Sequence, residues 1–350
     1  MNKEWSDKNK KMQLLIGRKD TFSEGIETLM DLRNDVFSQI SSIVHTYPAD
    51  AYHKMPYPTA NGFHNKTLAY SMWHIFRIED IVANTLIANE TQVLFTDDWL
   101  KRIGSPIITT GNELQGEQIA EFSKQLNIKE LYLYCKAVRA KTEEKLRKLE
   151  YSDLKRRFGE EDRERLILSN CVDSYDNYSG LIDYWCGKDV AGLIRMPFSR
   201  HWIMHVEAMR RIKNRLCEIA RKGVDQIAYC GLSCDHCFYS AWCGSCRTSY
   251  NTCSNATMYP DNICPNSACC RERNLDGCYE CKDIENCHTG FYSSRKGNAI
   301  KAQAFFINKY GKKELKKVLD NLHSKYEFKW IQEIIGYDPL EGLKILEEHR

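Results

Sequence analysis

The chain has 350 residues, of which 43% are hydrophobic and 28% are charged, and its net charge is +3 at pH 7. These values are those of an ordinary soluble protein with room for two domains. The small net charge gives no reason to expect an electrostatic partner such as DNA, and no apolar stretch is long enough to cross a membrane.

Cysteine is distributed unevenly along the chain. Twelve of the sixteen cysteines lie between Cys230 and Cys287. We therefore predict two domains, residues 1–222 and 223–350. The first residues lack the apolar core of a secretory signal, so we expect a cytoplasmic, reducing setting. In such a setting clustered cysteines hold metal more often than they form disulfides.

Two helical patterns precede residue 90. Residues 1–19 are polar and lysine-rich, and we expect a frayed segment or a short turn there. Apolar residues then recur at helical spacing from Phe22 to Ile43. Prolines between residues 48 and 58 break the chain, and a second helix is predicted over residues 66–88.

The second helix carries polar residues at different places on the helical wheel. His74 lies at the flank of the apolar face. Arg77 and Asp80 are expected to point away from that face. Glu79 falls inside it, which is unusual for a carboxylate. We interpret Glu79 as the partner of an arginine, as a group that handles protons near a metal, or as a residue that the helical wheel misplaces.

Two further long helices are predicted in the first domain. The third helix follows Asn127, and residues 150–197 form a charged and then tyrosine-rich insertion with short helices. The fourth helix has His201 and His205 one turn apart on its apolar stripe. Two imidazoles in this register can bind one ion, and burying both without a shared partner would cost desolvation twice. We therefore favour metal ligands over packing residues at these positions.

Four long amphipathic helices with a histidine pair on the last one resemble the DinB-like family of metal-binding four-helix bundles. The resemblance covers about residues 20–222, and it is carried by Trp73-His74-Ile75 and by His201-x3-His205. It implies an up-up-down-down bundle in which His74, His201 and His205 hold one divalent metal, which is zinc, nickel, iron or manganese. It also implies an enzyme, because characterised branches include thiol-dependent transferases and isomerases whose metal binds a small-molecule thiol.

The cysteine-rich region opens with a C-x3-C-x2-C run and contains three C-x2-C pairs. Two thiolates two residues apart can close on one tetrahedral ion. We expect structural zinc here, with iron–sulfur ligation as the smaller alternative. Of the adjacent residues Cys269 and Cys270, we expect one to be a ligand. The candidate ligands are Cys230, Cys234, Cys237, Cys243, Cys246, Cys253, Cys264, Cys269, Cys278, Cys281 and Cys287.

These cysteines, in this order, resemble a cysteine-rich module of bacteria and archaea called domain of unknown function 3795. The resemblance runs from about Ile227 to Tyr310, and it implies zinc binding without a settled activity. Thiolate-bound zinc would make this domain acidic, so we do not expect nucleic-acid binding. Apolar patterns between residues 302 and 335 predict helices that pack against the metal-binding part.

The sequence therefore predicts a mainly α protein, in which a four-helix bundle is followed by a cysteine-rich zinc-binding module and a helical tail. We expect a metal-dependent transferase or hydrolase that uses a small-molecule thiol, and a homodimer is compatible with the sequence. The alternative is a non-enzymatic scaffold, or a metal or redox sensor that acts through its cysteine-rich domain.

Overall fold

The computed structural model describes residues 2–173, 180–250, 253, 255–259 and 262–350. These residues are mainly helical, as predicted, and among them no β-strand forms. The chain divides into two compact units, one of residues 1–45 and 49–213 and the other of residues 46–48 and 214–350. The division falls inside helix α10 (His201–Lys222).

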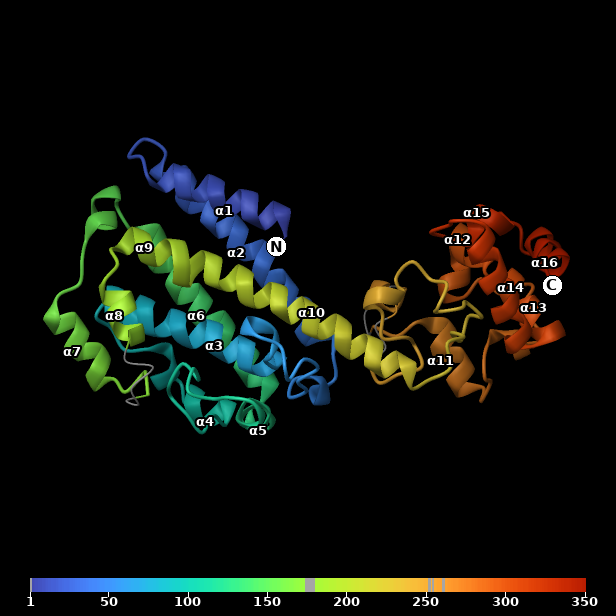
Figure 1. The fold of residues 1–350 in the computed structure, drawn as a ribbon, viewed down its shortest axis with the longest axis horizontal. Helices are drawn as coiled ribbons and strands as arrows, with labels where there is room; N and C mark the ends of the chain where they lie inside the picture. Colours follow the sequence, from blue (N-terminus) through green and yellow to red (C-terminus); the bar gives the residue numbers. More distant parts are fainter. Residues whose placement is uncertain (1, 174–179, 251–252, 254, 260–261) are drawn as a thin grey trace. The chain divides into compact units, whose positions relative to one another are not determined.

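The first unit is built around long helices that lie side by side (Figure 1). Aromatic contacts join them: the ring of Phe37 meets those of Phe76, Tyr132 and Trp202 at centroid distances of 5.8, 5.9 and 6.2 Å. The long helices are α2 (Phe22–Thr46), α3 (Leu68–Asp80), α6 (Ile128–Lys148) and α10. The shorter ones are α1 (Lys3–Ile16), α4 (Trp99–Ile103), α5 (Glu117–Gln125), α7 (Glu160–Leu168), α8 (Gly180–Cys186) and α9 (Val190–Arg195).

Helix α1 differs from what the sequence predicted. The prediction of a frayed segment or a short turn is wrong for residues 3–16, which form a regular helix. The reason is a sparse apolar stripe among the lysines: Trp5, Met12 and Ile16 are buried at intervals of two turns and one turn. The Asn2 side chain caps the helix by accepting a hydrogen bond from the Trp5 amide.

Helix α3 is buried on every side, because α5 and α6 pack against it and residues 108–111 run along another face. The expectation that Arg77 and Asp80 point away from the core is therefore wrong: both are fully buried. Arg77 donates to Asp80 at 3.1 Å, and the Tyr134 hydroxyl donates to the same carboxylate at 2.8 Å. Pairing and hydrogen bonding offset the cost of burying these charges. The helix continues as a π-helical segment, η3 (Ile81–Ile87).

The second unit has an irregular cysteine-rich segment followed by helices. Its core gathers side chains of α13, α14 and α16, including Phe306, Leu315, Leu319 and Leu346. Gly311, at φ 84°, separates α13 from α14 in a backbone conformation that favours glycine. The helices are α11 (Pro265–Glu272), α12 (Arg295–Ala299), α13 (Lys301–Tyr310), α14 (Lys312–Lys325), α15 (Gln332–Ile335) and α16 (Pro339–Glu348).

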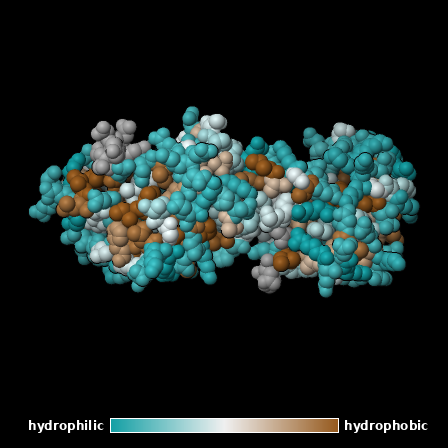
Figure 2. Space-filling model, turned by 90° about the horizontal axis from the view of Figure 1, so that it is seen from below, coloured by the Kyte–Doolittle hydropathy of each residue, from teal (hydrophilic) through white to brown (hydrophobic). Residues whose placement is uncertain are grey.

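Hydrophilic residues cover most of the surface on the face shown in Figure 2, and hydrophobic residues form small separate patches there. Among the described residues, no helix combines the length and the apolar character that a membrane crossing requires. The apolar side chains are used mainly to build the two cores.

Candidate metal centres

Three histidines converge inside the first unit. His74 comes from the middle of α3, and His201 and His205 come from the first turns of α10. Each is at most 7% exposed. Among the described residues, they are the group of His, Cys, Asp or Glu side chains whose ligand atoms all lie within 4.8 Å of one another. The structure thus brings together the three histidines that the sequence singled out.

The distances between the rings fit a shared ion. The Nε2 atoms of His74 and His201 are 3.2 Å apart. Two imidazole nitrogens bonded to one tetrahedral zinc ion lie about 3.3 Å apart, because each bond is about 2.05 Å long. The ring of His205 lies 4.8 Å from that of His74 and 4.6 Å from that of His201, centroid to centroid.

Ring nitrogens without partners support the same interpretation. Both nitrogens of His205 and the Nδ1 atom of His201 are buried and have no hydrogen-bond partner among the described residues. Leaving such atoms unpaired in the interior costs on the order of 1–3 kcal/mol each. A divalent cation between the three rings would bind the Nε2 atoms of His74 and His201, which face each other, and one of the unpaired nitrogens of His205. The residues present therefore fit a metal ion, although the Nδ1 atom of His201 would not be one of its ligands.

A hydrogen bond to the backbone of a neighbouring segment fixes the orientation of the His74 ring. Its Nδ1 atom donates to the carbonyl oxygen of Thr110 at 2.9 Å. Because a carbonyl can only accept, the proton is on Nδ1 and the Nε2 atom is left unprotonated, facing the other two rings. A backbone carbonyl bound to the far nitrogen is the usual support of a histidine that ligates metal.

A stripe of α3 side chains holds the segment that contains Thr110. Tyr70, Trp73 and Arg77 lie on the same helical face as His74, at positions i, i+3, i+4 and i+7. Their polar atoms donate to the carbonyls of Gly111, Thr109 and Ile108 at 3.0, 3.1 and 2.6 Å. Four successive carbonyls are therefore bound by one face of the helix. This segment keeps the ring of His74 in place.

Burial keeps the three imidazoles neutral. It lowers the pKa of His74 to about 4. The pKa values of His201 and His205 also lie well below the usual value, because of burial first and the neighbouring histidines second. Neutral imidazole is the form that binds metal. At neutral pH all three side chains are thus in the ligand form.

Glu79 belongs to the same helix as His74 and pairs with an arginine, which was one of the interpretations of its position. Arg33 donates to both carboxylate oxygens, at 2.7 and 3.0 Å. The indole of Trp202 donates to the same carboxylate at 2.8 Å. Because Trp202 follows His201 in the chain, this network fixes the first turn of α10 against α2 and α3.

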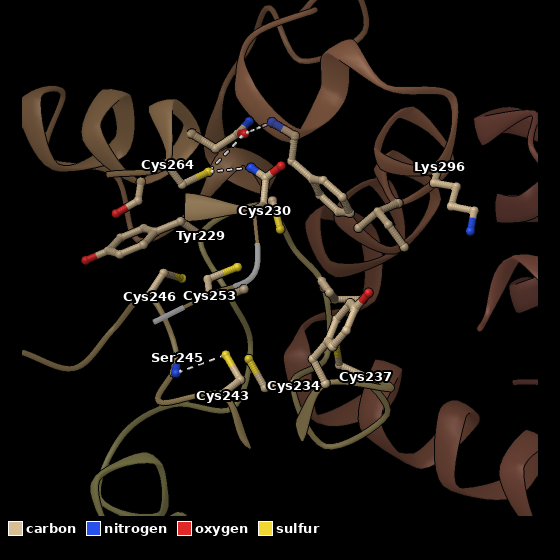
Figure 3. Close-up of a pocket in the computed structure, with 18 of the residues that line it drawn as sticks. Tyr229, Cys230, Cys234, Cys237, Cys243, Ser245, Cys246, Cys253, Cys264 and Lys296 are labelled. Carbon is tan, nitrogen blue, oxygen red and sulfur yellow. Dashed lines mark hydrogen bonds between the residues drawn. The ribbon is translucent and has the colours of Figure 1, made fainter. Parts of the chain in front are cut away.

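The second unit contains two cavities that are lined by cysteines. The first cysteine cavity has a volume of about 470 Å³, and the second has a volume of about 230 Å³. The twelve clustered cysteines divide between them in chain order. Cys230, Cys234, Cys237, Cys243, Cys246, Cys253 and Cys264 line the first (Figure 3). Cys269, Cys270, Cys278, Cys281 and Cys287 line the second.

All sixteen cysteines have free thiols, and several thiols accept hydrogen bonds. The Asn255 side chain donates to Cys264 at 3.2 Å, and the Ser245 amide donates to Cys243 at 3.4 Å (Figure 3). Such donors stabilise thiolates and are common around metal-bound sulfur.

Cys270 is a candidate that the predicted ligand set lacked. Its sulfur lies 3.6 Å from that of Cys278, and it lines the same cavity as its neighbour Cys269. Position in the chain does not show which member of an adjacent pair faces inward. Residue 270 is buried in α11, and 269 is partly exposed.

Comparisons with known families, curated proteins and solved structures found no match. Both family resemblances therefore stay predictions, and the function is argued from the geometry of the sites.

Proposed function

We propose that the first unit is a metal-dependent enzyme whose divalent cation is bound by His74, His201 and His205. The observation that carries this proposal is the convergence of three buried, neutral imidazoles, with nitrogens that have no other partner among the described residues. Three protein ligands leave a coordination position for a substrate or cofactor, which distinguishes catalytic from structural sites.

The arrangement of the long helices supports the DinB-like architecture as part of this proposal. The four predicted long helices correspond to α2, α3, α6 and α10. Long segments connect α2 to α3 and α6 to α10, as an up-up-down-down bundle requires, and the segment from η3 to α6 is long as well. The histidines come from the second and the last of these four helices, which is the distribution that the resemblance implies.

For the reaction, we propose a thiol-dependent transfer. A divalent cation lowers the pKa of a small-molecule thiol and gives a nucleophilic thiolate at neutral pH. Zinc, nickel, iron and manganese all accept imidazole ligands. The segment before α3 supplies two neighbours. The rings of Phe63 and His205 are T-shaped to each other with their centroids 4.6 Å apart, and the Lys66 Nζ atom lies 5.2 Å from the centre of the Tyr70 ring. The Lys66 ammonium would attract the anionic group of a substrate.

The alternative is a scaffold, or a sensor that uses its thiols. A redox-sensing cysteine is usually exposed and has a lowered pKa. Burial instead raises the pKa of Cys246 to about 11, and it raises that of Cys230 well above the usual value of a thiol. A hydrogen bond from Cys270 lowers the pKa of Cys278 to about 7, but Cys278 is itself buried. These three thiols therefore lack the features of a redox-sensing cysteine.

Substitution of one ligand tests the proposal. In the full-length protein, we expect His205→Ala to lower the divalent metal content by one ion per chain, measured by elemental analysis, with the far-ultraviolet circular dichroism unchanged. The matched control is His53→Ala, which removes a histidine of the same unit outside the cluster. An unchanged metal content in His205→Ala would refute the proposed site.

A further inference from the structure

In the first cysteine cavity the thiols of Cys243 and Cys253 are close enough to form a hydrogen bond, but among the described residues no third sulfur joins them within 4.8 Å. Four thiolates on one tetrahedral zinc ion lie about 3.8 Å from one another, because each Zn–S bond is about 2.3 Å long. The described residues include all sixteen cysteines, and among them no three sulfur atoms lie within 4.8 Å of one another. The ligand atoms of the three histidines do lie within 4.8 Å of one another. The histidine site is therefore compact enough for one ion, whereas the cysteines do not converge in this way.

The thiolates that bind a metal–sulfide cluster lie farther apart than those that bind a single zinc ion. In an iron–sulfur cluster each cysteine binds an iron atom, and inorganic sulfide ions lie between the irons, so thiolates on different irons are held apart. The labelled sulfurs of Cys230, Cys243, Cys246 and Cys253 face the same space in Figure 3. That space is part of a cavity of about 470 Å³.

The charge of the lining fits an anionic occupant. Arg221, Arg295 and Lys296 are among the described residues that line the first cysteine cavity, and no Asp or Glu is among them. A cluster with four thiolate ligands carries net negative charge, which nearby cations offset.

The second cysteine cavity resembles the first in its sulfur spacing but is about half its volume. Each cavity has one close pair of thiols: Cys270 and Cys278, whose sulfurs are 3.6 Å apart, in the second, and Cys243 and Cys253 in the first. The volume is therefore what distinguishes the two cavities, and the smaller one suits a single ion.

From this geometry we infer that the first cysteine cavity binds an iron–sulfur cluster through four of its seven cysteines, in place of the structural zinc that cysteine spacing alone favours. The inference is independent of the histidine site, because all of its residues lie in the second unit.

The test is chemical analysis of the full-length protein, purified without oxygen and incubated with sulfide and a mixture of ferric and ferrous iron, so that the ferric ions supply the oxidised irons of the cluster. We expect iron and acid-labile sulfide in equal amounts, about two or about four of each per chain. We also expect visible absorption from sulfide-to-iron charge transfer that bleaches on reduction with dithionite. Zinc without acid-labile sulfide, after the same incubation, would overturn the inference.

Cysteine variants locate the cluster. The double variant Cys243→Ser with Cys246→Ser should lose the iron, the sulfide and the visible absorption. Two controls carry the same kind of substitution: Cys281→Ser in the second cysteine cavity and Cys186→Ser in the first unit. Both should keep at least nine-tenths of the iron. Loss of iron in Cys281→Ser with retention in the double variant would contradict the assignment. If the double variant does not fold, the analysis of the wild-type protein decides.

Discussion

His74 and His205 are buried side by side but differ in their hydrogen bonds. The Nδ1 atom of His74 is bound to the Thr110 carbonyl, whereas neither nitrogen of His205 has a partner among the described residues. His74 is thus oriented by the protein itself. The unpaired nitrogens of His205 make it the residue whose burial most needs a ligand.

The buried imidazoles predict how the stability of the metal-free protein depends on pH. The pKa of His74 is about 4 in the folded state, whereas an exposed histidine has a pKa of about 6.5. Between these values the unfolded state binds a proton that the folded state does not, so stability falls as the pH falls. From pH 7 to pH 5, we expect His74 alone to lower the free energy of unfolding by about 2 kcal/mol.

Urea unfolding of the metal-free protein at pH 7, 6 and 5 measures this effect. The His74→Gln variant lacks the titrating group and should lose less stability over the same range. The same decrease in both proteins would show that His74 does not titrate as its burial requires.

At the scale of the elements, the pair of Glu79 and Arg33 joins α3 to α2, and the Trp202 indole joins α10 to the same carboxylate. Replacing Glu79 with Ala would leave the Arg33 guanidinium buried, with Glu143 and the Phe198 carbonyl as its remaining partners. We expect a loss of about 3 kcal/mol in the free energy of unfolding, because breaking a buried pair leaves a poorly compensated charge.

The Glu79→Ala variant should also bind metal more weakly, because Trp202 no longer fixes the turn that carries His201. Isothermal titration of the metal-free protein with zinc measures this. The control is Glu90→Ala, which breaks exposed pairs with Lys141 and Lys145 and should change neither stability nor affinity appreciably. Equal effects of the two variants would show that burial of the network is not what matters.

Some of these elements were predictable from sequence and some were not. The periodicity of α10 placed His201 and His205 on one stripe, and both are buried there. The helical wheel of α3 wrongly predicted that Arg77 and Asp80 face solvent. A wheel assumes that one side of the helix is exposed, and every residue of this helix is buried. The support of His74 by Thr110 could not be predicted either, because it joins residues that are 36 positions apart.

At the scale of the whole molecule, the two units offer different ligands. Imidazoles converge in the first unit, and thiols line two cavities in the second. Sequence spacing identified nearly all of the cysteines concerned. Sequence spacing could not show which cysteine lines which cavity, because this depends on how segments that are far apart in the chain fold against one another. Nor could it give the separation of the sulfurs, which distinguishes a cluster from a single ion.

The most direct test of the account is anomalous X-ray diffraction from crystals of the full-length protein, at the absorption edge of the metal that elemental analysis identifies. We predict an anomalous peak among His74, His201 and His205, with a ring nitrogen of each about 2.1 Å from the ion. The absence of a peak there, with the rings bonded to one another or to water, would contradict the proposed metal centre.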